Sequence, residues 1–113
     1  MNYMLKTVMM VVLISMTFVS KANEVVDSLL KKGNEYYMQH QYAMAERCYA
    51  RILQLGYESG DVYFNLGNSY YKQSMYAKAI LNYERALQLN PGQKDIKDNL
   101  ALANMHIIDR IEV

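Results

Sequence analysis

The sequence predicts an all-α fold: two helix-turn-helix repeats and a C-terminal capping helix, preceded by a signal peptide. Three observations support this prediction. Residues 26–59 align without gaps to residues 60–93, and 14 of the 34 positions are identical. The first 22 residues are apolar with a basic start, and residues 94–110 repeat the apolar spacing of a first repeat helix. A fixed period of this length indicates one supersecondary unit that stacks on copies of itself.

Residues 1–22 have the organisation of a secretory signal peptide. Lys6 supplies a positive start, residues 7–19 are apolar, and Ser20 and Ala22 are the small residues that a cleavage site before Asn23 requires. The alternative is a membrane anchor that is not cleaved. Thirteen helical residues reach only about 20 Å, against a hydrocarbon core of roughly 30 Å, so cleavage is favoured. We therefore expect an exported chain of residues 23–113, located in the periplasm or cell envelope.

The charge balance argues against nucleic acid as a partner. Removing residues 1–22 takes away two of the 12 Lys and Arg and none of the 11 Asp and Glu, which leaves a net charge of −1. No basic stripe survives that would indicate nucleic-acid binding. Cys48 is the only cysteine, so no internal disulfide is expected. It is read as a buried or half-buried helix residue. The alternative is an intermolecular disulfide, because Asn82 at the equivalent place suggests a solvent-accessible position.

The expected helices of residues 23–113 span 24–39, 42–55, 60–73, 76–89 and 94–110. Gly56 and Gly60 bracket the turn between the two repeats, and Asp61 is placed to cap or complement the start of the third helix. The run Asn90-Pro91-Gly92 ends the fourth helix, because proline cannot continue it. The fifth helix is expected to cover the open edge of the second repeat with Ile96, Leu100, Ala101, Ala103 and Ile107 facing inward.

Small and large residues recur at fixed places in both copies. Small side chains stand where two helices must approach closely, and tyrosines are of a size to fill the space between paired helices. In the second copy these positions are Tyr63, Leu66, Gly67, Tyr70, Ala79, Tyr83, Ala86 and Pro91. The first copy keeps Gly33, Tyr36, Ala45 and Tyr49. This pattern, at a period of 34, resembles the tetratricopeptide repeat, a family of helical repeats that bind proteins.

A narrower resemblance covers residues 63–112. The stretches 63–72 and 77–87, with Ile108-Asp109-Arg110-Ile111-Glu112 beyond them, are similar to the Bacteroides aerotolerance proteins of the BatE type. That resemblance implies an exported, membrane-associated repeat protein of an operon that also encodes a MoxR-type ATPase and von Willebrand A-domain proteins. Members usually continue into transmembrane segments and an SH3-like domain. We therefore expect a shortened or truncated member. The resemblance lends no catalytic residue.

The first helix of each repeat lines the concave groove of such stacks. Asparagine side chains there carry donors and acceptors for a peptide backbone, and aromatic side chains add rigid apolar contact. The alternative is that the asparagines only bond their neighbours and solvent. We also expect that replacing Asn34 and Asn68 together by Ala leaves thermal melting nearly intact. The predicted groove residues are Leu30, Asn34, Tyr37, Met38, Phe64, Asn65, Asn68, Tyr71 and Lys72.

Relatives that bind chaperones hold a C-terminal carboxylate with lysine and arginine. Asn34 and Asn65 match two asparagines of that clamp, but Leu30, Asp95 and Asn99 stand where its cations belong. No carboxylate clamp is predicted.

The sequence predicts a non-catalytic protein-interaction adaptor or scaffold without cofactor or metal. Its partner is a protein or peptide of unknown identity, including other envelope proteins of the same operon. One alternative is a structural module that self-associates through the apolar C-terminal helix (Ile107, Ile108 and Ile111). Another is an accessory protein that binds a cell-wall ligand in the tyrosine-rich groove. His40 and His106 each lack a second metal ligand at helical or loop spacing.

Overall fold

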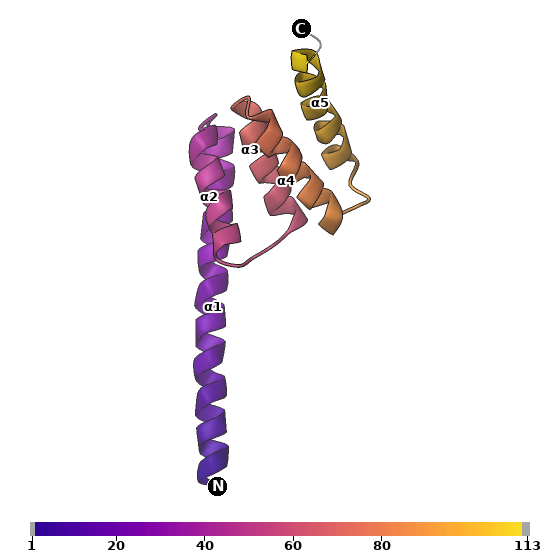
Figure 1. Ribbon diagram of the computed structural model, residues 1–113. Helices are drawn as coiled ribbons and strands as arrows, with labels where there is room; N and C mark the ends of the chain where they lie inside the picture. Colours follow the sequence, from indigo (N-terminus) through magenta and orange to yellow (C-terminus); the bar gives the residue numbers. More distant parts are fainter. Residues whose placement is uncertain (1, 112–113) are drawn as a thin grey trace.

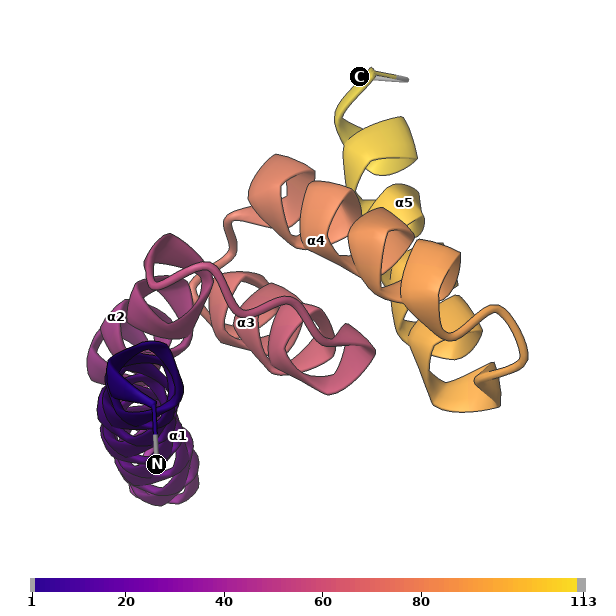
Figure 2. The same ribbon diagram turned by 90° about the horizontal axis from the view of Figure 1, so that it is seen from below.

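A computed structural model describes residues 2–111, and within that range the chain consists of five helices and their connections. They are α1 (Tyr3–Met38), α2 (Tyr42–Gln54), α3 (Gly60–Lys72), α4 (Tyr76–Leu89) and α5 (Lys94–Ile111). Successive helices run in opposite directions, and each packs against the next in the chain (Figure 1). Seen from below, they follow one another from α1 to α5 as a row of helices (Figure 2). The all-α repeat fold predicted from the sequence is confirmed.

Helix α1 is much longer than the predicted helix over residues 24–39. It runs without a break from Tyr3 to Met38, and its N-terminal half extends beyond the rest of the molecule (Figure 1). No glycine or proline lies between residues 3 and 32 to interrupt it. An 18-residue window near its start has a mean hydropathy of 1.7 and is not covered by other parts of the molecule. By length and composition, α1 is therefore a helix that can cross a membrane.

The two turns inside the repeats have the same geometry. His40 and Ser74 both adopt a left-handed conformation, with φ of 60° and 61°. In each turn the following residue donates its N–H to a carbonyl five residues back, Gln41 to Tyr36 and Met75 to Tyr70, both at 2.9 Å. This is the Schellman arrangement, which satisfies the last carbonyls of a helix. It ends α1 and α3 and directs the chain into the antiparallel partner helix.

The start of α3 is capped by Ser59, and Asp61 has the second of its two expected roles, complementing the helix start. Ser59 precedes the helix, and its Oγ accepts a 3.1 Å hydrogen bond from the backbone N–H of Val62. Asp61 lies in the first helical turn, where its charge complements the helix dipole. The cap is Ser59 because the capping position is the last residue with extended backbone, and Asp61 is already helical.

The core is built from tyrosine rings packed against glycines. Tyr49 of α2 and Tyr83 of α4 are each 1% exposed. A Cβ added to Gly33 or Gly67 would lie 2.7 Å from the nearest atoms of these rings. Other residues of the repeat signature surround them. Ala45, Ala79, Ala86, Tyr63 and Leu66 are buried, Tyr36 and Tyr70 pack against the core, and Pro91 follows α4 in an exposed turn.

Helix α5 covers the open side of α4, as predicted. Ile96 and Ala103 are buried, and Leu100 packs on the same cluster as Tyr83. Ala101 is exposed, so its predicted inward position is wrong. The inward stripe follows residues 96, 100, 103 and 107, and a residue one place after Leu100 lies about 100° around the helix from it.

Cys48 and its counterpart Asn82 are both buried. The suggestion of a solvent-accessible position is therefore wrong. Burial also raises the pKa of the Cys48 thiol, against a smaller opposing effect of Lys32. Asn82 donates from Nδ2 to the carbonyl of Lys78 at 2.8 Å, a local bond within α4.

Candidate functional site

One polar pairing recurs in both repeats. The hydroxyl of Tyr49 on α2 donates to Oδ1 of Asn34 on α1 at 2.6 Å. The hydroxyl of Tyr83 on α4 donates to Oδ1 of Asn68 on α3 at 2.7 Å. The sequence separation is 15 residues in both pairs. Because the ring of each tyrosine is buried between its two helices, the pairing places a fixed asparagine amide at the same point of each repeat.

The second pairing is extended by the capping helix. Nδ2 of Asn99 on α5 donates to the same Oδ1 of Asn68 at 2.9 Å. The side-chain oxygen of Asn68, a residue of α3, therefore accepts one hydrogen bond from α4 and one from α5. This bond positions α5 relative to the first helix of the repeat, with which it makes few other contacts.

Both tyrosine hydroxyls are protonated donors at neutral pH. Burial raises the pKa of Tyr49 to about 12, with smaller contributions from Tyr37 and Cys48. Burial also raises the pKa of Tyr83. A phenol in apolar surroundings resists ionisation because the charged form loses its hydration. Each hydroxyl therefore carries a proton, which it donates to the asparagine oxygen that it faces.

A hollow of about 300 Å³ opens between the two repeats. It is lined by Asn34, Tyr37, Met38, Tyr49, Asn65 and Asn68. Asn34 and Met38 are exposed, and Tyr37, Asn65 and Asn68 are half-buried. We call this the inter-repeat hollow. It combines amide groups with an aromatic and a thioether side chain, which suits a peptide better than a small charged ligand.

A smaller hollow of about 160 Å³ lies next to it. Its lining is Tyr37, Asn68, Tyr71, Lys72, Tyr83, Asn99 and Leu102. Tyr37 and Asn68 belong to both hollows, so the two are continuous across α3. Together they form one groove that runs from α1 over α3 to α5, and this surface is called the groove below.

Seven of the nine residues predicted for the groove line it. Asn34, Tyr37, Met38, Asn65 and Asn68 line the inter-repeat hollow, and Tyr71 and Lys72 line the smaller one. Leu30 and Phe64 do not line either hollow. Leu30 packs on the cluster around Tyr49, and the ring of Phe64 is tilted against that of Tyr83 at 5.9 Å. Both lie about one turn before an asparagine and face the space between paired helices.

Four lining residues were not among the predicted groove set: Tyr49, Tyr83, Asn99 and Leu102. Tyr49 and Tyr83 were assigned to the core, where their rings do lie. Their hydroxyls reach the groove from beneath. The constant spacing of 15 residues between asparagine and tyrosine in both copies is the sequence signal that marks this second role.

The capping helix is fixed at the edge of the groove by an aromatic cluster. Nε2 of His106 lies 3.0 Å from the hydroxyl of Tyr71, and the ring of His106 stacks on Tyr76 with 4.1 Å between centroids and 4° between planes. Tyr76 in turn meets Tyr71 edge to face at 5.4 Å. These contacts join the end of α3, the start of α4 and the last part of α5.

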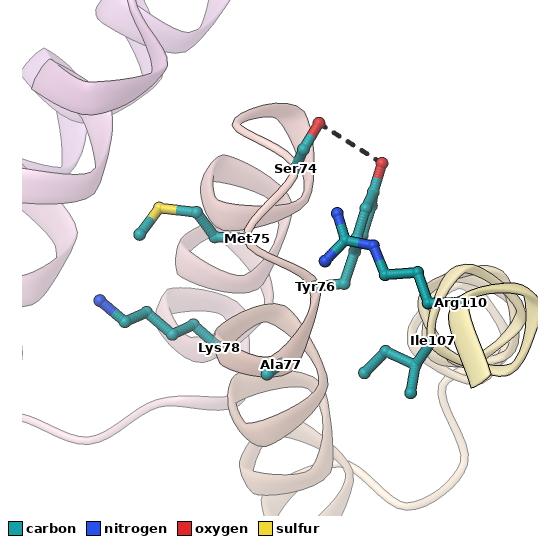
Figure 3. Close-up of a pocket in the computed structure, with 7 residues that line it drawn as sticks. All are labelled: Ser74, Met75, Tyr76, Ala77, Lys78, Ile107 and Arg110. Carbon is teal, nitrogen blue, oxygen red and sulfur yellow. Dashed lines mark hydrogen bonds between the residues drawn. The ribbon is translucent and has the colours of Figure 1, made fainter. Parts of the chain in front are cut away.

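A further hollow of about 440 Å³ lies outside the groove, at the start of α4. Figure 3 shows its lining: Ser74, Met75, Tyr76, Ala77, Lys78, Ile107 and Arg110. The guanidinium of Arg110 lies 5.9 Å from the ring centroid of Tyr76, while Lys78 points to the other side of α4 (Figure 3). The two cations therefore do not converge on one point, so this hollow does not resemble a built anion site.

Within residues 2–111, no group of three or more His, Cys, Asp and Glu side chains is arranged to hold a metal ion. The only salt bridge in that range is the exposed pair Lys94–Asp98, at 2.7 Å. The polar groups of the groove are neutral amides and phenols, with Lys72 at one end. Such groups bind by hydrogen bonding and stacking.

Residues 60–93 match the family model of the tetratricopeptide repeat. Comparison with curated proteins finds no match. The matched residues are α3, α4 and the turn that follows them, so the second of the two copies is the one recognised. The chain thus contains a tetratricopeptide repeat, and repeats of this family generally mediate binding to protein partners and are typically not catalytic.

Proposed function

We propose that this protein is an exported adaptor that binds an extended segment of a partner protein in its groove. The observation that carries the proposal is the inter-repeat hollow, where Asn34 and Asn68 of successive repeats lie beside Tyr37 and Met38. Amide groups at repeated places match the regular backbone of an extended peptide, and the aromatic and thioether side chains match its side chains. Binding by such a surface needs no covalent chemistry.

The finer part of the proposal concerns location. Large apolar side chains in the first half of α1 are widely exposed, for example Phe18 at 70% and Val19 at 60%. Such a surface is not stable in water, which supports either removal of the segment or its insertion into a membrane. Cleavage before Asn23 would leave an asparagine at the capping position of the shortened helix, with Glu24 and Asp27 in its first turns. That fit favours processing. An exported chain of this kind would act in a cell-envelope complex, and the sequence resemblance suggests one of the aerotolerance-operon type.

Processing is tested by the mass of the protein recovered from a cell envelope. The proposal expects a chain that begins at Asn23 in the periplasmic fraction. A chain with the mass of the full 13.2 kDa protein in the membrane fraction would contradict cleavage and favour a retained anchor.

Groove binding is tested with a library of random 12-residue peptides displayed on phage and selected on the full chain in mild detergent. The groove variant is Met38→Glu, because Met38 is 79% exposed and lines the inter-repeat hollow. The control is Leu81→Glu, an exposed apolar residue of α4 outside the groove. The proposal expects Met38→Glu to weaken the selected peptide at least tenfold and Leu81→Glu to leave it unchanged. Equal effects would move the site away from the groove.

Self-association through α5 is a second candidate. Leu102, Met105 and Ile108 are 48%, 58% and 52% exposed on α5, which supports an apolar contact with another copy. Of the three isoleucines that the sequence suggested for this contact, Ile108 is exposed and Ile107 lines the hollow of Figure 3. The side chain of Ile111 and the residue Glu112 lie outside the described part of the chain. Light scattering separates the two functions, because a monomer at micromolar concentration would contradict self-association.

A further inference from the structure

Within the described part of the chain, the side-chain amide nitrogens of Asn34, Asn65 and Asn68 have no hydrogen-bond partner. Oδ1 of Asn34 and Oδ1 of Asn68 each accept from a tyrosine hydroxyl. Within residues 2–111, neither Nδ2 group donates to another protein atom, and the side chain of Asn65 makes no hydrogen bond either. All three side chains line the inter-repeat hollow. The hollow therefore presents free amide NH₂ groups, whereas the amide oxygens of Asn34 and Asn68 already accept hydrogen bonds within the protein.

The orientation of the two amides is fixed from the core. Tyr49 and Tyr83 are each 1% exposed and wedged against Gly33 and Gly67, so their hydroxyls cannot move far. Each hydroxyl donates to the amide oxygen of its asparagine. The amide oxygen therefore faces the tyrosine, and the amide nitrogen faces away from it.

In the second repeat the same amide oxygen has a second donor. Oδ1 of Asn68 also accepts from Nδ2 of Asn99. Turning the Asn68 amide alone would place its NH₂ group against the NH₂ group of Asn99, so the observed orientation is the one that suits Asn99 as it lies.

We propose that the hydroxyls of Tyr49 and Tyr83 are positioning groups that turn the Nδ2 atoms of Asn34 and Asn68 into the groove as donors for backbone carbonyl oxygens of a bound peptide. This inference rests on the proposed function and specifies its chemistry. The groove selects acceptors, and it reads the peptide backbone at these points independently of the peptide's sequence. Sequence preference then arises from Tyr37, Met38 and Leu102, which line the same groove.

The experiment uses the peptide selected from the random library and measures its dissociation constant for four forms of the full chain in mild detergent. These are the unaltered chain, Tyr49→Phe, Asn34→Ala and the double variant. Tyr49→Phe keeps the ring against Gly33 and removes only the hydroxyl. If Tyr49 acts through Asn34, Tyr49→Phe weakens binding about fivefold in the unaltered chain and has no further effect in the Asn34→Ala chain.

The matched control is Tyr36→Phe, which removes a half-buried hydroxyl that makes no side-chain hydrogen bond in the described chain. It should leave the affinity unchanged. A spectroscopic readout separates positioning from simple loss of stability. The side-chain amide signals of Asn34, observed by ¹⁵N NMR of the free protein, should shift and broaden in Tyr49→Phe while the backbone signals of α3 and α4 stay in place.

The outcomes separate this inference from the proposed function. A peptide that is lost in Met38→Glu but binds Tyr49→Phe with unchanged affinity would overturn the positioning role alone. The same holds if Tyr49→Phe weakens binding equally with and without Asn34. If no peptide is selected, or if Met38→Glu has no effect, the proposed function fails and the inference fails with it. Coupling between Tyr49 and Asn34 in the peptide affinity supports both.

Discussion

The ring of Tyr83 lies directly against the backbone of Gly67. A Cβ at Gly67 would lie 2.7 Å from Cδ1 and Cε1 of that ring and 3.3 Å from the carbonyl oxygen of Ala79. The first repeat has the same relationship between Tyr49 and Gly33. The two helices of each repeat can therefore approach this closely only because glycine has no Cβ. The same tyrosines then carry their hydroxyls to the groove.

Adding that methyl group should destabilise the module. We expect Gly67→Ala to lower the free energy of unfolding by up to about 2 kcal/mol, because an overpacking cost of about 1–3 kcal/mol opposes a helix-propensity gain of roughly 1 kcal/mol. Gly67→Leu should prevent folding. Circular dichroism melting measures both. The control is Gly92→Ala, since nothing lies within 4 Å of its Cβ position. Equal melting of Gly67→Ala and Gly92→Ala would contradict the packing account.

The two asparagines should contribute unequally to stability. Asn68→Ala leaves the hydroxyl of Tyr83 and the amide of Asn99 without their acceptor, at a cost of about 1–3 kcal/mol. Asn34→Ala should cost less, because Asn34 is exposed and water can replace it. Denaturant unfolding checks the order. The structure thus argues against the expectation that replacing both asparagines leaves melting nearly intact. Equal, negligible losses in both variants would restore that expectation.

High pH should unfold the protein through its buried tyrosines. Burial raises the pKa of Tyr49 to about 12 in the folded state, above the ordinary value of roughly 10 in the unfolded chain. The folded state therefore keeps its full stability below about pH 10 and loses it as the pH rises from 10 towards 12. Titration of tyrosinate absorbance should show late-ionising tyrosines that ionise together with loss of helical signal. A single transition of all tyrosines near pH 10 in a still-folded protein would contradict this.

The left-handed turn residues offer a stabilising substitution. Ser74 has φ of 61°, a conformation that costs a residue with a side chain about 1–2 kcal/mol and glycine almost nothing. We expect Ser74→Gly to stabilise the chain by about 1 kcal/mol, since its side chain is exposed and accepts only a 3.4 Å bond from Tyr76. Gly56→Ala is the opposite test, because Gly56 has φ of 89° in open space. Its melting temperature should fall. A fall for Ser74→Gly as well would refute the argument.

The parts of the fold that the sequence predicts are those with local signals. Helix α4 begins and ends where expected, at Tyr76 and Leu89, because Pro91 and the repeated turn mark its limits. Helix α1 differs because no residue before Gly33 can break it, so the apolar start continues into the repeat. The groove asparagines follow from their repeat position. The role of Tyr83 in the groove was missed because packing alone explains a tyrosine at that place.

The central claim about this protein is that the groove is its binding surface. The direct measurement is a ¹⁵N NMR spectrum of the full chain in mild detergent, recorded with and without a peptide selected from the random library. If the groove binds the peptide, the side-chain amide signals of Asn34, Asn65 and Asn68 should shift on binding, together with backbone signals along α1 and α3. Shifts confined to the start of α4 and the end of α5, with unchanged asparagine amides, would place binding elsewhere and contradict the claim.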